Sequence, residues 1–210
     1  MQNSARLYYV HDPMCSWCWG FRPTMARLAT RLPPAVSLVR LLGGLAPDSD
    51  APMPAELRAY LQQTWRRIQA RIPGTRFNFD FWDHCTPRRS TWPACRAVIA
   101  ARRLDPVAEE RMIGAIQEAY YLQARNPSEQ AVLVELAQET GLDPQAFGAL
   151  LQEPDTAAAL RSEMALAKSM GADSFPSLRL QLGDALHPID IDYNDAAPML
   201  GAIEALLPRH

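Results

Sequence analysis

The fold is indicated most clearly by residues 12–21, which read Asp12-Pro13-Met14-Cys15-Ser16-Trp17-Cys18-Trp19-Gly20-Phe21. It follows a short apolar run that predicts a strand over residues 6–10, and the spacing from 15 to 31 predicts a helix. Cys15 would then lie at a helix N-terminus, where free backbone N–H groups and the helix macrodipole stabilise a thiolate. Cys18 lies about one turn further on, close enough to form a disulfide with Cys15. Such a cysteine pair is typical of a redox centre that exchanges two electrons with other thiols.

A second β-rich run covers residues 36–42 and ends at Gly43-Gly44. Strand, helix and strand in this order predict a βαβ unit with two parallel strands. The redox motif would therefore lie at the carboxyl end of the first strand, where open α/β sheets place their sites.

The section from about residue 47 to residue 171 has helical spacing throughout. Three pairs of a capping residue and a proline, which are typical of helix starts, are Asp105-Pro106, Asn126-Pro127 and Asp143-Pro144. Gly141 and Gly171 stand where helices are expected to end. The section is therefore predicted to be all-helical.

The β pattern returns after the helical section. Apolar and polar residues alternate over 176–182, and Gly183-Asp184 favours a turn into a second run over 186–191. A last helix is expected over 196–207. The order β-α-β, helices, β-β-α predicts an α/β protein with a thioredoxin-like fold and a large all-helical insertion. We expect residues 1–46 and 171–210 to form the two halves of one thioredoxin-like domain, with 47–170 as the inserted helical domain.

Composition narrows the function classes. The chain has 210 residues, of which 48 % are hydrophobic, and a formal net charge of -2, which gives no reason to expect nucleic acid or an acidic membrane surface as partner. No run approaches the roughly 18 apolar residues of a membrane span, and the first residues lack the pattern of a secretory signal. We therefore expect a cytoplasmic protein. In that compartment, four cysteines favour catalysis or metal binding over a disulfide scaffold.

The sequence resembles the DsbA family of thiol–disulfide oxidoreductases, and within it the FrnE-like branch. The resemblance covers essentially the whole chain and rests on four stretches: Asp12 to Cys18, Gly43-Gly44-Leu45, Ser90-Thr91-Trp92-Pro93-Ala94-Cys95-Arg96-Ala97, and Gly171 to Phe175-Pro176. It implies that Pro176 is a cis-proline facing the active-site disulfide, with Phe175 before it. A cis bond there would expose the Phe175 backbone to an extended peptide substrate. A plain turn proline is the alternative.

Two departures from the family pattern bear on the chemistry. Members with a strongly tuned site often carry a buried acidic residue six positions before the first cysteine, where this chain has Tyr9. The proton that leaves Cys18 then needs another acceptor, for which water, His11 and Asp12 are the candidates. The pair Ser16-Trp17 also lacks the imidazole of the Pro-His pair found in strongly oxidising members, so a very oxidising potential is not expected.

Two side chains near the cysteines have further candidate roles. Trp17, at the expected exposed tip of the motif, could contact unfolded substrates through its apolar ring. His11 could tune the reactivity of Cys15 or shuttle a proton; a loop histidine without a role is the alternative. Trp19 is expected in the core.

The sequence therefore predicts a thiol–disulfide oxidoreductase or isomerase in which the Cys15 thiolate attacks a substrate disulfide and Cys18 resolves the mixed disulfide. Its partners would be protein or small-molecule thiols and disulfides. No organic cofactor or metal is expected, although glutathione as co-substrate and an oligomeric state are left open.

Three alternatives remain. One is a glutathione-binding transferase or isomerase of the same superfamily. Those enzymes have a serine at the position of Cys15, so the intact cysteine pair of this chain counts against that alternative. Another is a zinc site completed by Cys85, Cys95 or His84, which is weakened because Cys85 and Cys95 do not form a second C-x-x-C. Without zinc, Cys95 is expected to pack as a small apolar residue of a helix. The third is a non-catalytic, chaperone-like binding module.

Overall fold

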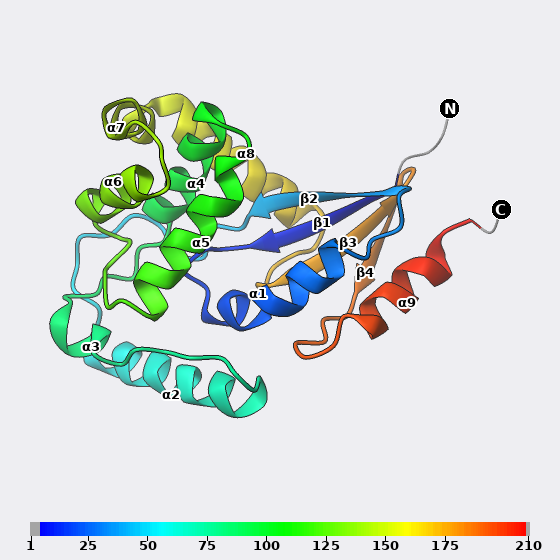
Figure 1. Cartoon of the computed structure of the whole chain (residues 1–210), viewed down its shortest axis with the longest axis horizontal. Helices are drawn as coiled ribbons and strands as arrows, with labels where there is room; N and C mark the ends of the chain where they lie inside the picture. The colour runs from blue at the N-terminus through cyan, green and yellow to red at the C-terminus, as the bar shows by residue number, and fades with distance from the viewer. Residues whose placement is uncertain (1–4, 209–210) are drawn as a thin grey trace.

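The computed structural model describes residues 5–208, which contain four strands and nine helices (Figure 1). The strands are β1 (Ala5–His11), β2 (Val36–Leu42), β3 (Ser177–Leu182) and β4 (Ala185–Ile189). The helices are α1 (Ser16–Ala29), α2 (Ala55–Arg71), α3 (Phe81–His84), α4 (Trp92–Leu104), α5 (Ala108–Tyr121), α6 (Gln130–Glu139), α7 (Pro144–Gln152), α8 (Pro154–Ser169) and α9 (Ala197–Leu206). This order confirms the predicted α/β class, in which a helical section interrupts β-α-β and β-β-α.

The strands form one sheet in the order β2-β1-β3-β4. β1 and β2 are parallel, as the βαβ unit predicts, and Tyr9 lies opposite Arg40. β3 pairs antiparallel with both β1 and β4. Because β1 has a neighbour on each side, all of its residues except Arg6 are buried. The carboxyl end of β1 therefore gives the redox motif a rigid origin.

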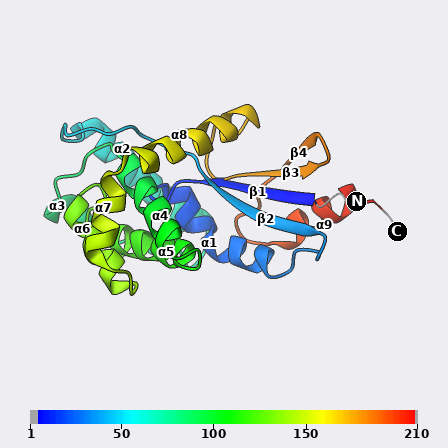
Figure 2. The same cartoon turned by 90° about the horizontal axis from the view of Figure 1, so that it is seen from above.

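Helices cover both faces of the sheet (Figure 2). On one face, side chains of β1 such as Leu7 pack with Phe21 of α1 and Ile203 of α9. On the other face, Val10 packs with Ala167 of α8. Burial on both faces explains the near-continuous apolar character of β1.

Helices α2 to α7 gather beyond the end of the sheet to which β1 and β2 point (Figure 1). At their centre, α4 packs against α5, α6, α7 and α8. Trp65 of α2 is buried among aromatic rings, namely those of Phe77, Phe79, Phe81, Trp82, Tyr120 and Tyr121. The helical section thus has an apolar core of its own, and it faces the end of the sheet that carries the redox motif. The division into domains 1–46 with 171–210 and 47–170 stays a prediction, and its residues 1–4 and 209–210 lie outside the described part of the chain.

Three helix ends follow the expected capping chemistry. Asp143 accepts hydrogen bonds from the backbone N–H groups of Gln145 and Ala146 and so caps α7. Gly141 and Gly171 follow α6 and α8 with φ of 86° and 66°, which glycine adopts without steric cost.

Two predicted helix starts are wrong by a few residues. α5 begins at Ala108 and α6 at Gln130, after the pairs Asp105-Pro106 and Asn126-Pro127. The side chains of Asp105 and Asn126 accept hydrogen bonds from the N–H groups two residues on, which closes local turns before each helix begins.

None of the helices between residues 5 and 208 combines the length and hydropathy that crossing a membrane requires.

Candidate redox site

The two motif cysteines lie at the start of α1. Cys15 is the N-cap residue, with extended backbone angles, and its carbonyl accepts the hydrogen bond from the Trp19 N–H that starts the helix. Its side chain is 6 % exposed, whereas that of Cys18 is fully buried. Both are present as thiols. Cys15 is therefore the sulfur nearer to solvent, as an attacking thiol must be.

The loop before β3 closes over Cys15. The Phe175–Pro176 peptide bond is cis, which confirms the predicted isomer. The Cys15 thiol donates to the carbonyl oxygen of Phe175 at 3.5 Å, so the backbone beside the cis bond lies next to the redox sulfur. The Phe175 ring lies against Gly43, where an added Cβ would come within 2.1 Å of the ring. Gly43 after β2 is therefore needed for this loop to approach, whereas the role of Phe175 and Pro176 in substrate binding stays a prediction.

The carboxylate of Asp12 connects the motif stretches. It is completely buried, and its Oδ1 accepts a hydrogen bond from the Met14 N–H at 2.8 Å, just before Cys15. Its Oδ2 accepts from the Leu45 N–H at 2.7 Å and from the Thr91 hydroxyl at 2.6 Å. One carboxylate thus joins the redox loop, the Gly43-Gly44-Leu45 loop and the start of α4. Burial raises the pKa of the Asp12 carboxyl, and these hydrogen bonds act against that rise.

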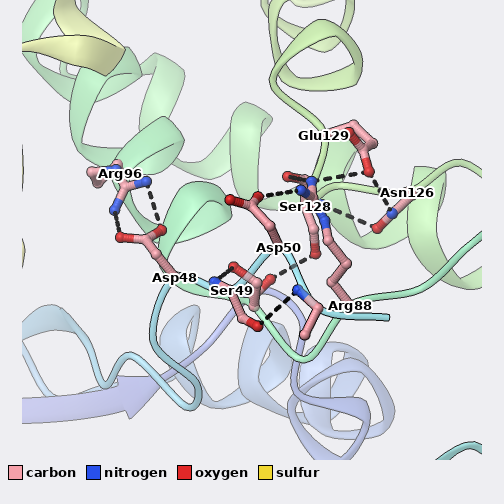
Figure 3. A network of polar contacts seen from close by, with 10 residues as sticks. Asp48, Ser49, Asp50, Arg88, Arg96, Asn126, Ser128 and Glu129 are labelled. Carbon is pink, nitrogen blue, oxygen red and sulfur yellow. Dashed lines mark hydrogen bonds and ion pairs between the residues drawn. The ribbon is translucent and has the colours of Figure 1, made fainter. Parts of the chain in front are cut away.

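The loop that follows Leu45 is fixed by ion pairs (Figure 3). Arg96 of α4 donates to both oxygens of Asp48 at 2.8 Å. Arg88 pairs with Asp50 and with Glu129, each at 2.9 Å. The Arg96 pair holds the chain between β2 and α2 against α4, and the Arg88 pairs join it to the segments before α4 and α6. These contacts support the position of the Leu45 N–H at Asp12.

Burial raises the pKa of the Cys18 thiol well above its ordinary value, and the neighbouring Cys15 raises it further. Tyr9, at the position where related proteins often have an acid, is also buried beside the pair. Burial and then negative charge on Cys18 and Cys15 raise the pKa of the Tyr9 phenol. Cys18 thus holds its proton until a base or water removes it, and Tyr9 is no base at neutral pH.

His11 lies within β1 rather than in a loop. It is 1 % exposed, and its ring stacks on that of Tyr9 with centroids 4.8 Å apart. Burial, with the charges of Arg40 and Arg102, lowers the pKa of His11 to about 3. Among the described residues its Nε2 has no hydrogen-bond partner, and it lines a pocket of about 210 Å³ with Gln117. A neutral imidazole of such low basicity is poorly suited to hold the Cys18 proton, which leaves water and Asp12 as candidate acceptors.

The two residues between the cysteines differ in exposure. Ser16 begins α1 and is buried. Trp17 is half-buried rather than an exposed tip, because its ring contacts Tyr193 with centroids 5.1 Å apart and lies under the Arg71 guanidinium at 5.7 Å. Trp19, expected in the core, is also half-buried and donates its indole N–H to the Arg76 carbonyl.

The remaining cysteines do not converge on the pair. Cys95 is buried on α4, and its thiol donates to Oδ2 of Asp12 at 3.4 Å, so it is more than an apolar packing residue. The Cys85 thiol donates to the Ala124 carbonyl at 3.1 Å. Between residues 5 and 208, no three side chains of His, Cys, Asp or Glu are grouped as metal ligands.

The sequence predicted Asp12 only as a candidate proton acceptor, and its structural role was not predicted. The available signal was that Asp12, Leu45 and Thr91 lie in three of the stretches on which the family resemblance rests. Tyr193 and Arg71, which pack on Trp17, lie outside every motif, and no local pattern singles them out.

Comparison with known protein families matches a model described as "Thioredoxin" over residues 8–181. The chain therefore belongs to the thioredoxin family, and its fold is that of the DsbA-type oxidoreductases within it.

Among solved structures, a Nitrosomonas europaea protein proposed to be a disulfide isomerase has a TM-score of 0.83 at 24 % identity, covering 96 % of this chain and 97 % of its own. The cytosolic disulfide reductase DsbM of Pseudomonas aeruginosa has a TM-score of 0.77 at 29 % identity, covering 95 % and 97 %, and has also been solved with GSH. The ClpXP adapter protein SpxH of Halalkalibacterium halodurans is 27 % identical over 84 % of this chain. The chain spans 58 % of the length of that adapter.

Replacing Asp12 by Asn is expected to destabilise the fold. The amide offers one acceptor oxygen, so the backbone N–H of either Met14 or Leu45 would face an NH2 group, at about 1–3 kcal/mol for a buried donor left unpaired. For a chain of this size each kcal/mol lowers the melting temperature by roughly 2–4 °C. The matched control is Asp143→Asn, since Asn caps a helix about as well as Asp. Equal melting temperatures for the two variants would contradict the role given to Asp12.

Replacing His11 by Phe is expected to flatten the pH dependence of stability. Below pH 6.5 the unfolded chain takes up a proton that the folded state excludes until about pH 3. Stability is therefore fully present above pH 6.5 and falls by roughly 1.4 kcal/mol per pH unit below it. Urea unfolding at pH 7 and pH 5 is expected to show about 2 kcal/mol more loss in the wild type than in His11→Phe, where the ring stack is kept. The same loss in both proteins would mean that His11 is protonated in the fold.

Proposed function

We propose that the chain is a thiol–disulfide oxidoreductase whose working centre is Cys15-Ser16-Trp17-Cys18. The observation that carries the proposal is the position of the Cys15 sulfur at the N-cap of α1, 3.5 Å from the carbonyl oxygen that precedes a cis-proline. An extended substrate beside that backbone would bring its disulfide to Cys15. Cys18, buried one turn further on, resolves the Cys15–substrate mixed disulfide.

Two thiol–disulfide exchange steps transfer two electrons from the protein dithiol to the substrate disulfide. The Cys15 thiolate attacks one sulfur of a substrate disulfide, a Cys15–substrate disulfide forms, and the other substrate sulfur leaves as a thiolate. Cys18 loses its proton and attacks the Cys15 sulfur, which releases the second substrate thiol and leaves the Cys15–Cys18 disulfide. The protein dithiol is oxidised by two electrons and the substrate disulfide is reduced.

We propose reduction in the cytoplasm as the working direction, with reduced glutathione as the reductant that regenerates the dithiol. The support is the 29 % identity to a protein described as a cytosolic disulfide reductase and solved with GSH. Isomerase activity would use the same Cys15 attack without net oxidation. Assignment to the FrnE-like branch also stays a prediction.

A second candidate is an adapter or other binding module without redox turnover. The observation behind it is the similarity to SpxH adapters over 84 % of this chain. Function that survives replacement of both motif cysteines would favour that candidate.

The test is to trap the first intermediate. Cys18→Ser incubated with glutathione disulfide is expected to gain one glutathione, mapped by mass spectrometry to Cys15, because the thiol that would resolve the mixed disulfide has been removed. The wild type is expected to lose two hydrogens and release glutathione. Cys15→Ser is expected to form no such adduct at the site. Half-exposed Cys85 serves as an internal control, and an adduct on Cys85 in place of Cys15 would contradict the proposal.

A further inference from the structure

A groove runs along the outer side of α1, away from the sheet. It is bounded by α1, by residues 72–76 after α2 and by Tyr193-Asn194, and its volume is about 490 Å³. We call it the α1 groove. α1 and α2 lie side by side, because Gly20 lets Ile72 approach so closely that an added Cβ would come within 2.7 Å of its Cδ1. The groove is therefore built by close packing of two elements.

The α1 groove carries positive charge and apolar surface together. Arg22, Arg27 and Arg76 line it, and no Asp or Glu does. Arg22 pairs with Glu118, but neither Arg27 nor Arg76 forms an ion pair within residues 5–208. The guanidinium of Arg27 instead donates to the Thr24 hydroxyl at 2.6 Å and to the Asn194 carbonyl at 2.9 Å, which holds its position. Two cationic side chains on one groove are thus left without a carboxylate.

The groove is continuous with the redox motif. Tyr193, which lines the groove, contacts the ring of Trp17 between the two cysteines. Arg71 lies over both rings, 5.7 Å from the centroid of Trp17 and 5.5 Å from that of Tyr193. Trp17, Tyr193 and Arg71 therefore connect the residue between the cysteines to the groove.

The dimensions fit a peptide chain. Arg27 stands 12 positions after Cys15 (27 − 15), which on an α-helix is about 18 Å along the axis. An extended peptide covers that distance in about five or six residues. A client segment attached at Cys15 can therefore reach Arg27, whereas a tripeptide such as glutathione is too short.

We propose that the α1 groove binds an acidic, extended segment of a client protein whose disulfide is attacked by Cys15. Client carboxylates pair with Arg27 and Arg76, and client apolar side chains lie against Trp19 and Pro23. This inference rests on the proposed function and adds the class of substrate, which is a disulfide in an acidic stretch of a protein. Charge complementarity selects the occupant, since a basic segment would be repelled by the same arginines.

The experiment uses two peptides with one cysteine each, activated as the thiopyridyl mixed disulfide. In one peptide, glutamates occupy the fourth to seventh positions on either side of the cysteine; in the other, glutamines do. The Cys15 thiolate of the reduced protein attacks the peptide sulfur, and thiopyridone leaves and is read by its absorbance. Cys18 then displaces the peptide thiol. The acidic peptide is expected to react about fivefold faster, the size expected of two exposed Arg–carboxylate contacts. In about 1 M salt, which screens charges beyond about 3 Å, the difference is expected to vanish.

The double variant Arg27→Gln with Arg76→Gln is expected to lose the fivefold preference and to react with the two peptides at equal rates. Release of thiopyridone from both peptides would report that the Cys15 site is intact. The matched control is Arg6→Gln with Arg161→Gln, two exposed arginines without ion pairs in the described chain, and it is expected to keep the preference. Equal rates of the wild type on both peptides, or an equal loss of the preference in both double variants, would overturn the proposed binding in the α1 groove. Either result would leave the proposed function standing. No thiopyridone release, or the same release by Cys15→Ser, would overturn both.

Discussion

The arrangement around the redox motif depends on one buried carboxylate, that of Asp12. Burying a carboxylate is costly unless donors surround it, and here the backbone of Met14, the backbone of Leu45 and the hydroxyl of Thr91 supply them. Because these donors come from the redox loop, the loop after β2 and the start of α4, the sheet and the helical section meet at this residue. The carboxylate thereby fixes the loop from which Cys15 begins α1, and α1 in turn carries Cys18 into the core. The cis-proline loop can close over Cys15 because Gly43, in the same anchored segment, leaves room for the Phe175 ring.

Much of the fold could be predicted because its signals are local. Apolar runs bounded by glycine or proline predicted the four strands, and the order of strands and helices predicted a thioredoxin-like sheet with its motif at the end of β1. The cysteine pair could be assigned to a helix N-terminus for the same reason, and the cis isomer at Pro176 followed from the family resemblance.

The rest depends on contacts between distant positions. Leu45 and Thr91 lie 33 and 79 positions after Asp12, so no local sequence pattern predicts that all three meet. The sequence predicted Trp17 to be an exposed tip, but the ring of Tyr193, far along the chain, packs against it. His11 follows an apolar run and reads as a loop residue, but pairing with Leu42 extends β1 through it and buries it. The starts of α5 and α6 were misplaced because Asp105 and Asn126 close turns instead of capping helices.

Whether Cys15 and Cys18 form a working two-electron couple is measured by equilibrium titration in glutathione redox buffers. Alkylation of free thiols followed by mass spectrometry would count the oxidised fraction. We expect one reversible couple in the wild type and in Cys95→Ser, absent in Cys15→Ser, with a potential nearer about -270 mV than about -120 mV. A wild type without a couple, or a couple that survives Cys15→Ser, would contradict this expectation.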